Sequence, residues 1–383
     1  MAKATAYLDY NASAPLLMSA RRAMESAMDC DANPSSVHRA GKAARRLVED
    51  ARRQVADLVG ASAEHVVFTS GATEAATTLL TPHWHMGRAP MTCSHLYVLA
   101  SDHPCLLSGG RFPEGKVTRL PVTTDGLADL DAMRRALEEH DTETGLPLVA
   151  LHAANNETGV LQPLDAIRAL VVDAGGLLVV DAVQAAGRVS IDIANGYADF
   201  VILSAHKLGG PRGVGACVAR AGLVMPEPLV RGGGQERGHR AGTENVAGIA
   251  GFGAAAEDAR AGLSSMADVA ALRDGFEAQI AAILPAVVIH GQGAPRIANT
   301  SFVSLPGLKA ETAQIALDLE GLQVSAGSAC SSGKVGPSHV LEAMGADAGL
   351  GALRVSIGRA TTRDELERLV ETLKVLLARR KAA

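Results

Sequence analysis

The 383-residue sequence has few cysteines, no long uninterrupted apolar run and no excess of positive charge. Its five cysteines are scattered and odd in number, which indicates reduced thiols and argues against a disulfide framework: Cys30, Cys93, Cys105, Cys217 and Cys330. The 36 Lys and Arg residues against 41 Asp and Glu residues leave a formal charge of −5. This balance argues against a nucleic-acid partner and favours a small molecule.

Membrane and secretion signals are also missing from the sequence. The most apolar stretch, residues 170–183, is interrupted by Asp173 and Asp181 and is shorter than the roughly 18 residues that a membrane span needs. Acidic Asp9 comes before any apolar segment that could act as a secretion signal. The sequence therefore predicts a soluble cytoplasmic protein without membrane contact.

A composition of 48% hydrophobic and 20% charged residues is typical of a globular protein, and the length predicts two to three folding units. Over the first two thirds of the chain, apolar β-rich segments alternate with helical patterns. The expected strands are residues 65–69, 96–100, 117–122, 148–152, 177–181, 200–204 and 215–219. Several are apolar at every position, which predicts an α/β fold with a mostly parallel central sheet and helices on both faces.

Residues 41–59 show the spacing of an amphipathic helix. The arginines of this segment lie off the apolar stripe, and we expect all four to form a solvated face: Arg45, Arg46, Arg52 and Arg53.

The pattern changes after about residue 260. It predicts helices at 261–284 and 311–320, strands at 298–305 and 353–357, and a final helix. A glycine- and serine-rich stretch occupies residues 325–333. We expect a large domain of residues 15–260 and a smaller α+β domain of residues 1–14 with 261–383.

Two charged residues follow fully apolar strands. Lys207 comes just after residues 200–204, and Asp181 ends residues 177–181. Ligands of open α/β sheets bind at the carboxyl ends of the strands. A buried Asp needs a cation beside it, and a ligand with a protonated pyridine nitrogen and an aldehyde would engage both side chains. The pair therefore indicates a pyridoxal phosphate site.

A candidate phosphate site lies in the segment Thr69-Ser-Gly-Ala-Thr-Glu74, between an expected strand and a helix that begins near Thr73. The backbone N–H groups of a helix N-terminus bind anions. An ordinary capped helix start explains the same residues, so the segment alone leaves both readings open.

Ten segments of the sequence resemble the motifs of a known family. Motifs such as Ser204-Ala-His-Lys207 and Ser328-Ala-Cys-Ser-Ser-Gly333 resemble those of cysteine desulfurases of the nitrogen-fixation and iron–sulfur-cluster type, in the class-V aminotransferase superfamily. The resemblance extends in order from about residue 7 to 359, through segments 7–12, 33–38, 69–74, 103–104, 155–159, 181–184, 204–207, 232–238, 240–245 and 328–333. It implies a homodimeric, fold-type-I pyridoxal phosphate enzyme that converts L-cysteine to L-alanine.

The resemblance also implies roles for single residues. Lys207 would carry the cofactor as a Schiff base, Asp181 would pair with its pyridinium, Gln184 would donate to its phenolate oxygen, and His103 would stack on the ring and carry protons. Further cofactor contacts are implied for Ala72, Thr73, Asn155, Ser204 and His206, with Thr243 reaching in from the other subunit. Asn156 and Arg354 would hold the substrate carboxylate.

Cys330 is the implied sulfur acceptor. Its neighbours in about residues 325–335 are small, which suits a loop that carries a thiol, and no bulky apolar residue flanks it. The resemblance implies that Cys330 becomes a persulfide and passes sulfur to an acceptor protein such as an iron–sulfur cluster scaffold. No resident metal is implied, although Cys330 could contact a cluster during transfer.

Other functions are compatible with the same fold. A selenocysteine lyase or another pyridoxal phosphate lyase or aminotransferase could share the fold, and so could a non-catalytic scaffold. Residues 327–334 resemble a phosphate-binding P-loop but have the wrong glycine spacing. The cluster of His83, His85, Cys93 and His95 lacks the usual cysteine spacing of zinc sites, which argues against a metal there, although the sequence leaves metal binding in this region open.

Overall fold

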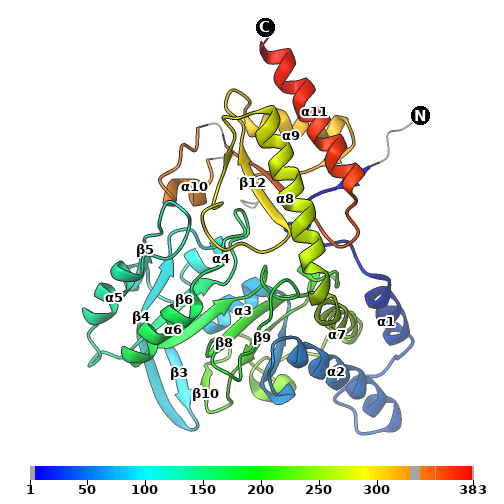
Figure 1. The fold of residues 1–383 in the computed structure, drawn as a ribbon. Coiled ribbons are helices and arrows are strands. Elements are labelled where there is room, and N and C mark those ends of the chain that lie inside the picture. Colours follow the sequence, from blue (N-terminus) through cyan, green and yellow to red (C-terminus); the bar gives the residue numbers. More distant parts are fainter. Residues whose placement is uncertain (1–4, 328–336, 350, 382–383) are drawn as a thin grey trace.

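The computed structural model describes residues 5–327, 337–349 and 351–381. Within these ranges, the large sheet has nine strands in the order β10-β3-β4-β6-β7-β8-β9-β2, with β5 beside β4 (Figure 1). The strands are β2 (Val66–Thr69), β3 (His83–Met86), β4 (Ala89–Leu99), β5 (Val117–Leu120), β6 (Leu146–His152), β7 (Leu177–Asp181), β8 (Phe200–Ser204), β9 (Gly215–Ala219) and β10 (Val224–Pro226).

The parallel part of this sheet lies at its centre. Strands β5, β4, β6, β7 and β8 pair in parallel, whereas β9 and β2 at one end and β3 and β10 at the other are antiparallel. The expected α/β fold is confirmed, and the predicted bounds of β7, β8 and β9 match the structure. The β3–β4 hairpin and β10 were not expected, because these segments lack a long apolar run.

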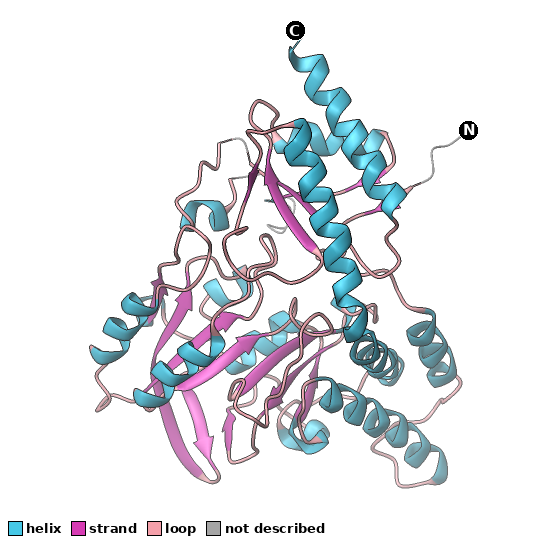
Figure 2. Cartoon of the chain, in the orientation of Figure 1, coloured by secondary structure: helices cyan, strands magenta, loops and turns pink. Residues whose placement is uncertain are grey.

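Helices cover both faces of the sheet (Figure 2). In β2, Val66 and Phe68 pack into one hydrophobic cluster with α2 and α7, while Val67 packs into another with α3 and α4. This two-sided burial explains why the central strands are apolar at every position. The helices of this region are α1 (Met18–Met28), α2 (Arg39–Leu58), α3 (Ala72–Leu79), α4 (Pro104–Leu107), α5 (Leu130–Glu138), α6 (Leu164–Asp173) and α7 (Val246–Ala261).

One prediction for α2 was wrong. Arg45, Arg46 and Arg53 are exposed as expected, but Arg52 is buried and only 4% exposed. Its guanidinium binds both carboxylate oxygens of Glu236, at 2.7 and 2.8 Å, and lies 4.9 Å from the centre of the Phe68 ring. The acid that pairs with Arg52 is 184 residues away in sequence, so helical periodicity alone could not reveal it.

A second region has its own antiparallel sheet, in the order β11-β12-β15-β14, and its own hydrophobic core. Its elements are α8 (Met266–Ile283), β11 (Val288–Ile289), β12 (Thr300–Ser304), α9 (Ala310–Leu319), β14 (Ser325–Ala326), α10 (His339–Ala343), β15 (Leu353–Ser356) and α11 (Arg363–Lys381). Strand β1 (Ala6–Tyr7) joins this region by pairing with β13 (Leu322–Gln323). The N-terminal Ala6 and Leu8 lie in the second core.

Short 3-10 helices connect several elements: η1 (Ala63–His65), η2 (Glu114–Lys116), η3 (Ala205–Lys207), η4 (Gln235–Gly238) and η5 (Gly262–Ser265). None of the helices in the described ranges is both long enough and apolar enough to cross a bilayer.

Candidate active site

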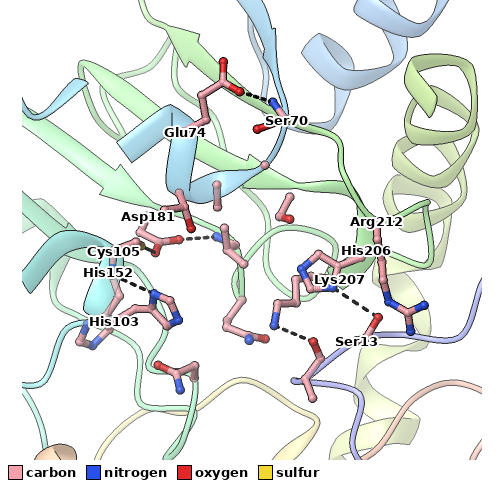
Figure 3. A pocket seen from close by; sticks show the side chains of 18 of the residues that line it. Ser13, Ser70, Glu74, His103, Cys105, His152, Asp181, His206, Lys207 and Arg212 are labelled. Carbon is pink, nitrogen blue, oxygen red and sulfur yellow. Dashed lines mark hydrogen bonds between the residues drawn. The ribbon is translucent and has the colours of Figure 1, made fainter. Parts of the chain in front are cut away.

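A cavity of about 550 Å³ opens where β6, β7 and β8 end. These neighbouring strands end in His152, Asp181 and Ser204, and all three side chains line the cavity. Most of the predicted site residues line it too: Ala72, Thr73, His103, Asn156, Asp181, Gln184, Ser204, His206 and Lys207. Figure 3 shows Asp181, Cys105, His103 and His152 on one side and Lys207, His206 and Arg212 on the other. The fold thus brings together residues from distant motifs.

Lys207 lies in η3, directly after β8. Its Nζ donates hydrogen bonds to the backbone oxygens of Asn11, at 2.5 Å, and Ala12, at 2.9 Å. The backbone N–H of Ala14 in turn donates to the carbonyl of His206. The N-terminal segment therefore holds the lysine amine in place, and sequence analysis did not anticipate this contact.

Asp181 is a buried carboxylate at the end of β7. Its Oδ1 accepts a hydrogen bond from Val183 N at 3.0 Å, and Cys105 Sγ lies 3.9 Å from its Oδ2. Burial raises the pKa of Asp181 to about 6, although the N–H of Val183, the neighbouring His152 and the charge of Lys207 act in the lowering direction, and the charge of Asp102 makes a smaller contribution to the rise. Asp181 makes no ion pair among the described residues. A desolvated carboxylate of this kind favours a cationic ligand atom.

His103 caps the N-terminus of α4, and its Nδ1 accepts a hydrogen bond from Cys105 N at 3.2 Å. Burial, followed by the charge of Lys207, lowers the pKa of His103 to about 4. The imidazole is therefore neutral at pH 7. Because Nδ1 accepts, the ring proton lies on Nε2.

The other end of the cavity is a backbone cradle. Gly71 precedes α3, and Ala72 and Thr73 form its first turn, where backbone N–H groups lack helical partners. A side chain at Gly215 of β9 would place its Cβ 2.7 Å from the Gly71 backbone, so only glycine allows this approach. Nothing lies within 4 Å of a Cβ built on Gly71. The cradle has the chemistry and the room for a phosphate.

Gln184 presents an unsatisfied polar atom. Its Nε2 donates to the Asn11 carbonyl at 2.9 Å, while its buried Oε1 has no hydrogen-bond partner among the described residues. Buried polar groups are normally paired, so an orphan atom in a cavity indicates a ligand. With the cradle and the desolvated carboxylate of Asp181, the residues fit pyridoxal phosphate.

Three of the predicted residues that the structure describes do not line this cavity: Asn155, Thr243 and Arg354. Asn155 Nδ2 donates to Ser101 O, and its Oδ1 accepts from the N–H groups of Glu157 and Thr158, so it supports the turn after β6. Exposed Thr243 lines a smaller adjoining cavity of about 180 Å³.

Arg354 lies on β15 and is buried. It donates to Asp9 Oδ1 at 2.8 Å and to the carbonyl of Asn156 at 3.1 Å. The two residues predicted to bind a carboxylate are thus in contact. Cys330, the predicted acceptor, lies outside the described residues.

Sequence reasoning missed several residues at the site. Asp102, His152 and Arg212 were not singled out, and Cys105 was noted only among the cysteines, although Cys105, His152 and Arg212 line the cavity and Asp102 binds His152. The available signal was that His152 is a polar residue at the end of an apolar strand, as Asp181 is. In the described part of the chain, no group of three or more His, Cys, Asp or Glu side chains is arranged to hold a metal ion.

Comparisons with known proteins agree with this geometry. The family profile of class-V aminotransferases matches residues 6–369. A cysteine desulfurase from Cereibacter sphaeroides is 42% identical over 96% of this chain and 94% of its own length. The chain belongs to the cysteine desulfurase family. Enzymes of this class-V aminotransferase family depend on pyridoxal phosphate.

Solved structures of similar proteins support the membership. A NifS-like protein from Rickettsia africae has a TM-score of 0.87 and 29% identity, with 98% of this chain and 100% of that chain covered. The protein SspA in complex with cysteine has a TM-score of 0.73 and 28% identity, with 92% and 99% covered. The relatives of this desulfurase thus share both its fold and nearly its full length.

Proposed function

We propose that this chain is a cysteine desulfurase that binds pyridoxal phosphate in the 550 Å³ cavity, converts L-cysteine to L-alanine and transfers the sulfur to Cys330. The observation that carries the proposal is that the Lys207 amine and the desolvated carboxylate of Asp181 line one cavity. Both groups are needed around a pyridine aldehyde, and neither is explained by the packing of the fold.

In this proposal the cradle of Ala72 and Thr73, with Ser204 and His206, holds the phosphate. Asp181 would pair with the ring nitrogen, Gln184 would meet the phenolate oxygen, and His103 would stack on the ring. Thr243 would complete the phosphate site of a second copy, a role that its exposure on this copy supports. Asn155 supports this arrangement through the turn after β6.

Bound pyridoxal phosphate supplies an electron sink for the bond-breaking steps at the substrate. Lys207 would be the attachment point of the cofactor, and its free amine would carry a proton from and to the substrate Cα. The carbonyls of Asn11 and Ala12 orient that amine. Neutral His103, with its proton on Nε2, exchanges a proton near the substrate sulfur.

Arg354 and Asn156 hold the substrate carboxylate. The guanidinium of Arg354 already binds the carboxylate of Asp9, so it accommodates the same chemistry in a buried setting. The sequence predicts a large domain of residues 15–260 and a small domain of residues 1–14 with 261–383, and Arg354 belongs to the small one. We propose the same two domains here, with the cavity between them.

The overall reaction balances without an outside oxidant. The Cys330 thiolate attacks the substrate sulfur, the Cβ–S bond breaks and an S–S bond forms, so that Cβ is reduced and the thiol sulfur is oxidised. Cβ receives the proton lost by the thiol, and L-alanine leaves. In this proposal the enzyme is a homodimer and acts in the cytoplasm, where thiols stay reduced. Cys330 passes the sulfur to an acceptor protein such as an iron–sulfur cluster scaffold.

The test is to supply the purified protein with pyridoxal phosphate, L-cysteine and a reducing thiol, and to measure sulfide and alanine. We expect a yellow protein that makes both products. Cys330→Ala should stay yellow but release no sulfide, whereas the matched control Cys30→Ala should behave as the wild type. Lys207→Ala should lose the label that borohydride fixes in the wild type. A colourless wild-type protein would refute the proposal, and a preference for selenocysteine would identify a selenocysteine lyase.

A further inference from the structure

A chain of buried polar residues lies behind the wall of the cavity that contains Asp181. His152, at the end of β6, is in register with Asp181 of β7, so the two side chains leave the sheet on the same face. Both line the cavity. Behind His152 lie Asp102, which follows β4, and Gln162, which precedes α6. These three residues have no role in the mechanism above.

The hydrogen bonds of Gln162 determine which nitrogen of His152 carries its proton. Ala128 N–H donates to Gln162 Oε1 at 2.8 Å, and a backbone N–H can only donate, so the other amide atom is nitrogen. Gln162 Nε2 donates one hydrogen to Gly126 O at 2.9 Å and directs the other at His152 Nε2, 3.0 Å away. His152 Nε2 therefore accepts, and the ring proton lies on Nδ1.

The Asp102 carboxylate accepts three hydrogen bonds, one of them from the Nδ1–H of His152. Its Oδ1 accepts from His152 Nδ1 at 2.5 Å and from His152 N at 2.8 Å, and its Oδ2 accepts from Leu99 N at 2.6 Å. The side chain is fully buried. Three N–H donors favour the carboxylate form, and a neutral imidazole does not cancel its charge. A second negative charge therefore lies buried near Asp181.

The other titratable groups around this wall do not change that balance. His339 donates from Nε2 to the backbone oxygen of Asp102 at 2.9 Å, and His103 is neutral at pH 7. Burial and the two aspartates raise the pKa of the Cys105 thiol. Lys207 faces the wall from the opposite side of the cavity (Figure 3). The wall thus combines two carboxylates with the neutral imidazole of His103 and the neutral thiol of Cys105.

We propose that Asp102, His152 and Gln162 are positioning residues that hold His152 in its neutral Nδ1–H form and add a second negative charge beside Asp181, which strengthens binding of a cationic ring nitrogen. The inference rests on the proposed pyridoxal phosphate site. The donor from Gln162 matters because a second proton on His152 Nε2 would neutralise Asp102 and place a positive charge next to the ring cation.

The first test uses the protein without cofactor. In ¹⁵N-resolved NMR of histidine-labelled protein, we expect His152 to show a protonated Nδ1 and a bare Nε2 at pH 7. Gln162→Leu removes the donor to Nε2 and should allow a second proton on the ring. A wild-type His152 with its proton on Nε2, or with protons on both nitrogens, would overturn the inference.

The second test measures ligand binding without chemistry. The probe is 4′-deoxypyridoxine 5′-phosphate, which keeps the ring nitrogen and the phosphate but cannot react with Lys207. We expect Asp102→Asn to weaken its binding about tenfold, the equivalent of one pKa unit of charge interaction, and to shift the absorbance titration of the bound ring to lower pH. The matched control is His290→Gln, which alters a buried histidine bound to Ser304 in the other core.

The outcomes separate this inference from the proposed function. If the wild type binds neither the probe nor pyridoxal phosphate, the proposed function fails. If the wild type binds both and Asp102→Asn binds the probe as tightly with the same absorbance titration, only the positioning role fails.

Discussion

Two buried carboxylates of this desulfurase differ in whether the chain supplies a paired cation. Glu236 binds the Arg52 guanidinium through both oxygens and also accepts from Phe68 N at 2.9 Å. Asp181 accepts a backbone N–H, contacts the Cys105 thiol and makes no ion pair within the described ranges. The first site is complete and stabilises the fold. The second is left for a ligand, and the comparison teaches that a buried carboxylate marks the binding site where it lines a cavity and has no ion pair.

The complete site also carries local backbone strain. Glu236 and its neighbour Arg237 both have positive φ angles, 45° and 55°, which non-glycine residues rarely adopt. The bidentate pair with Arg52 holds this turn against β2. The same loop continues to Thr243, which we propose reaches a second copy of the chain. The ion pair of Arg52 and Glu236 therefore fixes the start of this loop.

The largest expected effect comes from removing the cation of the complete site. Arg52→Met leaves Glu236 buried without its partner, which should lower the free energy of unfolding by about 3–5 kcal/mol. Urea unfolding monitored by circular dichroism measures the loss. The double variant Arg52→Met/Glu236→Gln should recover part of it, because no charge is then left unpaired. Equal stability of Arg52→Met and wild type would show that the pair is not structural.

The next effect concerns the incomplete site and its pH dependence. Since burial raises the pKa of Asp181 to about 6, its contribution to stability is present below its usual pKa and is lost as pH rises through about 6. In the cofactor-free protein, Asp181→Asn should therefore gain about 2 kcal/mol relative to wild type between pH 4 and pH 7. Urea unfolding at both pH values checks this difference. Pyridoxal phosphate should reduce the difference by stabilising only the wild type.

The smallest effect is expected at a third acid, Glu74, which is less buried than the other two. Its carboxylate binds Arg240 Nε at 2.9 Å and Ser70 N at 2.8 Å, and the Arg240 side chain is 27% exposed. Arg240→Met should cost only about 1 kcal/mol, because solvent screens the pair and the Ser70 bond remains. Thermal unfolding measures the change. A loss as large as that of Arg52→Met would remove the distinction between the buried and the half-exposed pair.

Much of the site was accessible from local sequence. Lys207 follows an apolar strand and Asp181 ends one, and parallel strands end at the same edge of a sheet, so both residues were expected in one pocket. Contacts made across long sequence distances were not accessible. The carbonyls of Asn11 and Ala12 that hold Lys207 lie almost 200 residues from it in sequence, and no periodic pattern marks a backbone acceptor.

The amino-acid sequence by itself determined which strands are buried on both faces, which polar residues end them, and the family to which the chain belongs. These properties depend on neighbouring residues and on local motifs. Only the tertiary structure decided that Arg52 is a buried partner of Glu236 rather than a surface charge, and that Asp102 and Gln162 set the proton of His152. The physical reason is that charge and hydrogen-bond partners are chosen by distance in space, which the folded chain alone defines.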